Sequence, residues 1–116
     1  MNGICHIEIP CKNLDTVSEF YSEIFDWKIM PMPGMEYSIY QPPSGPGGGF
    51  STNAKISEKA GVLLFIEVED IPATLKKIGA KGGKETCPKT MISPEHGFFA
   101  TFSDTEGNAI GLWSKN

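Results

Sequence analysis

The sequence lacks several features that would place the protein in a membrane, in an exported fraction or on nucleic acid. No apolar run approaches about 18 residues, the length of a membrane-spanning helix, so we expect no membrane segment. The chain does not begin with a basic stretch that leads into an apolar one, so we expect no signal peptide. The basic residues show no clustering, which argues against nucleic acid as a partner.

The sequence also has few cysteines, and their arrangement excludes some common sites. Cys5, Cys11 and Cys87 form no CxxC pair. An odd number of cysteines without an export signal predicts free thiols in a reducing cytoplasm. The glycine-rich stretch Gly45–Gly49 lacks the Lys-Ser/Thr pair that completes a phosphate-binding loop, so we interpret it as a flexible turn.

What the chain contains is an ordinary globular composition. It has 116 residues, of which 40% are hydrophobic and 21% charged, and its net charge is −4. A chain of this length can bury a core without disulfides or metals. We therefore predict a single domain over residues 1–116.

An internal repeat is the most informative feature of the sequence. His6-Ile7-Glu8-Ile9 and Phe65-Ile66-Glu67-Val68 align without a gap, and a helical pattern follows each of them. Expected strands are residues 4–10, 27–30, 37–41 and about 50 in the first half, and 62–68, 84–87, 98–103 and 109–114 in the second. Each half is therefore predicted to be a strand, a helix and three strands, over about residues 3–52 and 61–115, with polar residues 51–61 as the link.

Strand periodicity assigns the side chains of the opening strands to two faces. Ile7 and Ile9 share one face, which we expect to pack on the helix, whereas His6 and Glu8 share the other. Phe65 and Glu67 hold the matching positions in the second half. If both halves curl alike, these four side chains line a shared cleft.

The motifs resemble those of the vicinal oxygen chelate superfamily, which includes glyoxalase I, bleomycin-resistance proteins and extradiol dioxygenases. The similarity lies in residues 6–10, 19–27, 66–71, 99–108 and 110–113. The resemblance implies an α+β fold in which two βαβββ modules form a cupped mixed sheet. It also implies a homodimer.

The resemblance further implies where a metal ion would bind. Metal-dependent members place His and Glu ligands on the first and last strand of each module. Here those positions hold His6, Phe65, Gly111 and the stretch Gly48–Phe50, so one donor side chain remains. A single imidazole is not a metal site. We therefore expect no metal and no other cofactor.

The candidate functional residues lie on the faces that point away from the helices. We expect His6, Glu8 and Glu67 to be the catalytic candidates, because an imidazole and paired carboxylates can move a proton. Phe65, Gly111, Trp113 and His96 are the candidates for substrate binding, since aromatic side chains suit an apolar or planar ligand. The alternative for each residue is a structural or solvent-exposed role.

Three functions follow from this reading. The first is a glyoxalase-like protein that binds a small molecule without the family's metal site. The second is a glyoxalase-type lyase or isomerase, with a non-standard metal set or with metal-free acid–base chemistry. The third is a non-catalytic module for protein interaction.

Overall fold

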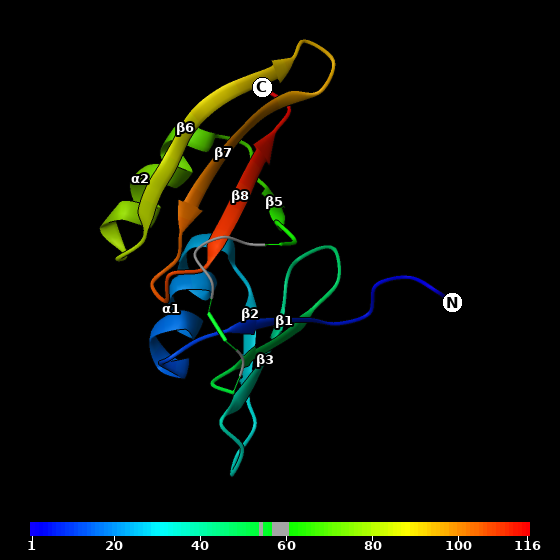
Figure 1. The fold of residues 1–116 in the computed structure, drawn as a ribbon, viewed down its shortest axis with the longest axis vertical. Helices are drawn as coiled ribbons and strands as arrows, with labels where there is room; N and C mark the ends of the chain where they lie inside the picture. The colour runs from blue at the N-terminus through cyan, green and yellow to red at the C-terminus, as the bar shows by residue number, and fades with distance from the viewer. Residues whose placement is uncertain (54, 57–60) are drawn as a thin grey trace. The chain divides into compact units, whose positions relative to one another are not determined.

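The computed structural model describes residues 1–53, 55–56 and 61–116, which form two compact units, residues 1–56 and 57–116. The predicted link 51–61 lies partly outside the described residues, because 54 and 57–60 are not among them. Each unit holds one helix and one four-stranded sheet (Figure 1). This arrangement confirms the predicted α+β class with a βαβββ order in each half. No helix in the described part of the chain is long and apolar enough to cross a membrane.

The first unit contains β1 (Ile7–Pro10), α1 (Leu14–Phe25), β2 (Lys28–Pro31), β3 (Tyr37–Gln41) and β4 (Gly48–Ser51). Its strand order is β1-β4-β3-β2, with β1 parallel to β4 and the other pairs antiparallel. Helix α1 begins where the Asn13 side chain accepts a hydrogen bond from the Thr16 N–H at 2.9 Å. It ends at Asp26, which has a left-handed backbone.

The core of the first unit is aromatic. The rings of Tyr21 and Trp27 are 4.7 Å apart, those of Trp27 and Tyr40 4.6 Å, and those of Tyr40 and Phe50 4.9 Å. These side chains come from α1, β3, β4 and the segment before β2, and each is buried. Helix α1 thus covers the face of the sheet that carries Tyr40 and Phe50, which leaves the opposite face open.

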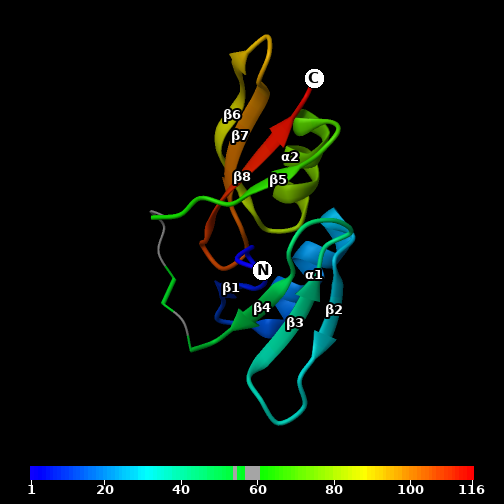
Figure 2. The same ribbon diagram turned by 90° about the vertical axis from the view of Figure 1, so that its right-hand side faces the viewer.

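The second unit contains β5 (Phe65–Glu67), α2 (Ile71–Ala80), β6 (Lys84–Ser93), β7 (Gly97–Ser103) and β8 (Ala109–Ser114). Its strand order is β5-β8-β7-β6, again with one parallel pair, β5 and β8 (Figure 2). The Asp70 side chain caps α2 by accepting from the Ala73 N–H at 2.9 Å. The core under α2 is mostly aliphatic and contains Ile71, Leu75, Ile78, Ala100, Phe102, Ile110 and Leu112.

Four strands differ from the predictions by more than one residue at a boundary. Strands β1 and β5 are shorter than expected and begin at Ile7 and Phe65. Strand β4 begins at Gly48, inside the stretch expected to be a turn. The reason is close packing, since a Cβ on Gly48 would overlap the Ile7 carbonyl oxygen of the neighbouring strand. Strand β6 runs on through Pro88 to Ser93, which an edge strand with register shifts tolerates.

The Asp104–Asn108 turn between β7 and β8 is confirmed. The buried Asp104 carboxylate accepts from the backbone N–H groups of Glu106 and Asn108 and from the Asn108 side-chain amide, each at 2.9 Å. Gly107 has a φ of +94°, a conformation that favours glycine. This turn fixes the register of β7 and β8 and hence the position of Trp113.

Candidate functional site

The open face of the first sheet carries a hydrogen-bonded group of three side chains, His6, Glu8 and Tyr37. The His6 Nε2 atom lies 2.7 Å from the Tyr37 hydroxyl oxygen. The two rings are stacked, with an interplanar angle of 8° and centroids 6.4 Å apart. The Tyr37 hydroxyl also hydrogen-bonds the Glu8 carboxylate. An imidazole, a phenol and a carboxylate therefore form one continuous chain.

The sheet register explains how residues 31 positions apart in sequence come together. Strand β4 lies between β1 and β3, with Gly49 opposite Glu8 on one side and opposite Ile39 on the other. The Tyr37 ring lies over Gly49, where a Cβ would overlap the ring and its hydroxyl. Glycine at position 49 thus gives the Tyr37 side chain the room to cross β4 and reach β1.

Proton counting gives the direction of these hydrogen bonds for an ionised Glu8 carboxylate. An ionised carboxylate only accepts, so the Tyr37 hydroxyl donates its single proton to Glu8. The Tyr37 oxygen then accepts from the Nε2–H of His6, which places the lone pair of the neutral imidazole on Nδ1. This tautomer makes Nδ1 the atom that can take a proton from a ligand.

Burial and the charge of Glu8 both raise the pKa of Tyr37. Burial of the hydroxyl raises the pKa of Tyr37 above its ordinary value, and the Glu8 charge and hydrogen bond raise it further. A raised pKa keeps the phenol protonated at neutral pH. Tyr37 is therefore a hydrogen-bond donor to Glu8.

A second tyrosine on the same strand has a different environment. Tyr40 is 2% exposed and donates to the Ile7 carbonyl at 2.7 Å. Burial, with a smaller contribution from the charge of Tyr37, raises the pKa of Tyr40. Tyr40 points into the core and Tyr37 toward the open face, as alternation along a strand requires.

In the second unit, the register places four of the candidate residues on one face. Phe65 pairs with Gly111 and Glu67 with Trp113 across the parallel strands β5 and β8. The space that the missing side chain of Gly111 leaves is filled by Phe65, whose ring would lie 2.5 Å from a Cβ there. Phe65 is 50% exposed, so its outer surface faces solvent.

His96 lies between β6 and β7. Its Nδ1 is 2.9 Å from the Ser93 hydroxyl, and its backbone carbonyl accepts from the Trp113 indole N–H at 2.7 Å. The backbone of His96 therefore orients Trp113, while its own side chain is exposed.

The donor set at the expected metal positions does not fit a metal ion. Phe65 and Gly111 supply no donor atom, and the Nε2 of His6 is bonded to Tyr37. Among residues 1–53, 55–56 and 61–116, no three His, Cys, Asp or Glu side chains are grouped so that they could hold a metal. Tight binding of a divalent ion needs several such ligands.

Tyr37 is the functional candidate that sequence reasoning missed. It carries no motif and lies in an alternating strand, as many structural tyrosines do. The only signal was indirect: the Gly48-Gly49 pair at the start of β4 provides room for a large neighbouring side chain.

Comparison with known proteins places the whole chain in one family. Residues 3–112 match the model of the Glyoxalase/Bleomycin resistance protein/Dioxygenase superfamily. A glyoxylase-like domain-containing protein from Didymella fabae is 33% identical over 119 residues, which cover 97% of this chain and 93% of that protein.

Solved structures show the same fold at low sequence identity. The fosfomycin resistance protein FosX from Listeria monocytogenes superposes with a TM-score of 0.81 at 15% identity, covering 100% of this chain and 95% of FosX. A glyoxylase/bleomycin resistance protein/dioxygenase domain from Frankia sp. EAN1pec gives 0.74 at 19% identity, covering 100% and 99% of the two chains. By its family match and its fold, this chain belongs to the glyoxalase/bleomycin resistance protein/dioxygenase superfamily.

Proposed function

We propose that this protein binds a small organic molecule on the open face of its first unit, without the metal site of the family. The observation that carries the proposal is the chain of His6, Tyr37 and Glu8, whose Nε2–hydroxyl distance is 2.7 Å. Oriented polar groups of this kind fix a ligand and give a site its specificity. His6 and Glu8 are exposed, so a ligand can reach them.

Apolar side chains next to this group support the same proposal. Ile39 lies opposite Gly49, and Met30 pairs with Ile39 on the adjacent strand, so both share the face of Glu8. Met30 is 56% exposed. A face with a few polar groups beside apolar side chains is typical of a site for small organic molecules.

For the second unit we propose that Phe65 and Trp113 can contact the apolar or planar part of a small molecule on their own face of the sheet. Gly111 allows the Phe65 ring to lie flat on the sheet. His96 supports Trp113 through its carbonyl. A homodimer and a cytoplasmic location are further parts of this proposal.

The second candidate function is metal-free proton transfer. It is favoured by the tautomer of His6, which leaves Nδ1 as a base while Tyr37 and Glu8 hold the ring in place. Glu67 is the corresponding acid–base candidate in the second unit. Loss of a measured turnover in both His6→Ala and Glu67→Gln would support this reading.

The binding proposal is tested by thermal unfolding in a screen of small carboxylic acids, phenols and hydroxyketones, first with EDTA and then with Mn(II), Zn(II) or Ni(II) in its place. We expect compounds that raise the Tm of the native protein and do not raise the Tm of His6→Ala. Glu19→Ala is the control, since Glu19 is exposed on α1, which covers the other face of the sheet. Stabilisation that requires added Mn(II), Zn(II) or Ni(II) would overturn the metal-free proposal.

A further inference from the structure

A cavity lies in the second unit, on the helix-covered side of its sheet. It has a volume of about 430 Å³ and is lined by Pro72, Leu75, Lys76, Glu85, Pro88 and Lys89. Small-molecule sites typically measure about 300–1,000 Å³. Its walls are α2 and the edge strand β6, whereas Phe65 and Trp113 lie on the opposite face of the sheet.

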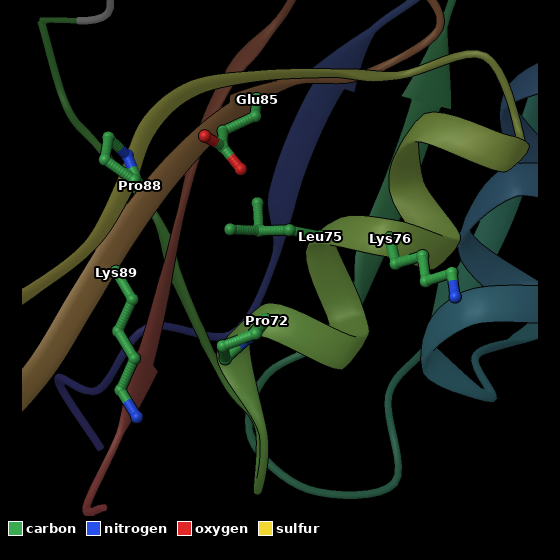
Figure 3. Close-up of a pocket in the computed structure, with 6 residues that line it drawn as sticks. All are labelled: Pro72, Leu75, Lys76, Glu85, Pro88 and Lys89. Carbon is green, nitrogen blue, oxygen red and sulfur yellow. The ribbon is translucent and has the colours of Figure 1, made fainter.

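The cavity has an apolar floor and polar sides. Figure 3 shows Pro72 and Leu75 on α2, with Pro88 across from them on β6. The Glu85 carboxylate enters from one side, and the Lys76 and Lys89 side chains extend outward on others (Figure 3). Leu75 is 8% exposed, so the cavity reaches the edge of the core.

The charge around this cavity is opposite to that of the chain. Residues 71–90 contain five of the ten basic residues, Lys76, Lys77, Lys81, Lys84 and Lys89, and one acidic residue, Glu85. All five lysines are exposed, in a protein whose net charge is −4. This concentration corrects the expectation that the basic residues do not cluster. A local positive field raises the concentration of anions near the cavity.

One of the two cavity lysines already has a defined position. The Lys89 Nζ lies 4.5 Å from the centroid of the Phe98 ring on β7. An aromatic ring below an ammonium group restrains it without neutralising its charge. Lys89 therefore presents a positive charge at the rim of the apolar floor.

We propose that this cavity is a second ligand site, distinct from the open face, for an organic anion with an apolar body and a hydrogen-bond donor. The apolar body covers Pro72, Leu75 and Pro88. The anionic group lies at the rim of the cavity, in the positive field of the Lys76 and Lys89 ammonium groups. The donor, a hydroxyl or an amine, meets the Glu85 carboxylate, which only accepts hydrogen bonds when ionised.

The test uses three related probes and the full chain, followed by two-dimensional 1H–15N NMR. The compound 6-hydroxy-2-naphthoate carries both polar groups, 2-naphthoate lacks the donor and 2-naphthol lacks the carboxylate. We expect saturable shifts at the backbone amides of residues 73–76, 85–87 and 89, with Kd on the order of 1 mM for 6-hydroxy-2-naphthoate. Binding should weaken for 2-naphthoate and further for 2-naphthol.

Charge variants measure how much the lysines and Glu85 contribute to binding, apart from the contribution of the apolar floor. Lys76→Gln/Lys89→Gln should weaken 6-hydroxy-2-naphthoate by about five- to tenfold, since exposed charge pairs are individually weak. Lys28→Gln/Lys115→Gln removes the same charge elsewhere and should leave Kd unchanged. Glu85→Gln should tighten 2-naphthoate, because a repelling carboxylate is gone.

Three results would overturn the second site. One is the same Kd for 2-naphthol and for the two acids, which would indicate nonspecific hydrophobic binding alone. Another is equal weakening in both double variants. The third is a set of shifts confined to Phe65, Trp113 and their neighbours on the opposite face of the second sheet.

Discussion

At the residue scale, the two tyrosines of β3 separate a role in ligand binding from a role in stability. Tyr37 contacts His6 and Glu8, both exposed, whereas Tyr40 is buried and bonds the backbone of β1. Both lose one hydroxyl on substitution by phenylalanine. Their different environments predict that Tyr37→Phe weakens ligand binding, whereas Tyr40→Phe lowers the stability of the fold.

Tyr37→Phe should leave the free energy of unfolding within about 0.5 kcal/mol of the native value, because water can replace the lost bonds of exposed partners. The ring remains over Gly49. Stabilisation by compounds found in the binding screen should fall, as in His6→Ala. Urea unfolding and the Tm shift with ligand measure the two effects; unchanged ligand stabilisation would remove Tyr37 from the proposed site.

Tyr40→Phe should lower the free energy of unfolding by about 1 kcal/mol at neutral pH, since a buried hydrogen bond to the Ile7 carbonyl is lost. The pKa of Tyr40 is raised above 10.0 in the folded protein. The phenol is thus more easily ionised in the unfolded chain, so this contribution is complete below pH 10 and is lost as pH rises above it.

Urea unfolding over the range from neutral to strongly alkaline pH measures this contribution. The native protein should lose more stability on the alkaline side than Tyr40→Phe does. Parallel curves for the two proteins would show that Tyr40 ionisation is not linked to folding.

At the element scale, the glycines of the central strands β4 and β8 are constrained in different ways. A Cβ on Gly48 would overlap the backbone carbonyl of Ile7, which is held by the β1–β4 ladder. A Cβ on Gly111 would meet the Phe65 ring at 2.5 Å, and that side chain is half exposed and can rotate. The Ile7 carbonyl cannot move away without breaking the strand pairing, whereas the Phe65 ring can rotate to another position.

We therefore predict that Gly48→Ala destabilises the protein by at least about 3 kcal/mol, whereas Gly111→Ala costs about 1 kcal/mol. Chemical denaturation of the two variants gives the comparison. Gly79→Ala in α2 is the control, because nothing lies within 4 Å of a Cβ there. Similar costs at positions 48 and 111 would contradict the difference in constraint.

Much of the element order could be predicted because the local signals agree with the fold. Asn13 and Asp70 each satisfy a free N–H at a helix start, and β8 has the boundaries expected from its alternation. The glycine-rich start of β4 could not be recognised, since its strand depends on contact with a carbonyl of β1. Pro88 likewise suggests an end to β6, which register shifts at the sheet edge accommodate.

At the scale of the whole molecule, the two units repeat one topology around different chemistry. The first has an aromatic core and a polar group on its open face, whereas the second has a mostly aliphatic core and exposed Phe65. Sequence periodicity predicted which face His6, Glu8 and Phe65 occupy. It could not predict the role of Tyr37. The Tyr37 side chain reaches His6, 31 residues away in sequence, because β1 and β3 lie on either side of β4.

The lack of donor side chains at the expected metal positions leads to a prediction about the metal content of the protein. A divalent ion needs several donors, and the expected positions supply His6 alone, with its Nε2 bonded to Tyr37. Protein incubated with excess Mn(II), Ni(II) or Zn(II) and then desalted should retain less than about 0.1 metal ion per chain by mass spectrometric elemental analysis. His6→Ala should give the same value. One equivalent retained by the native chain and lost in His6→Ala would establish a metal site at His6, and the open face would then be a metal centre.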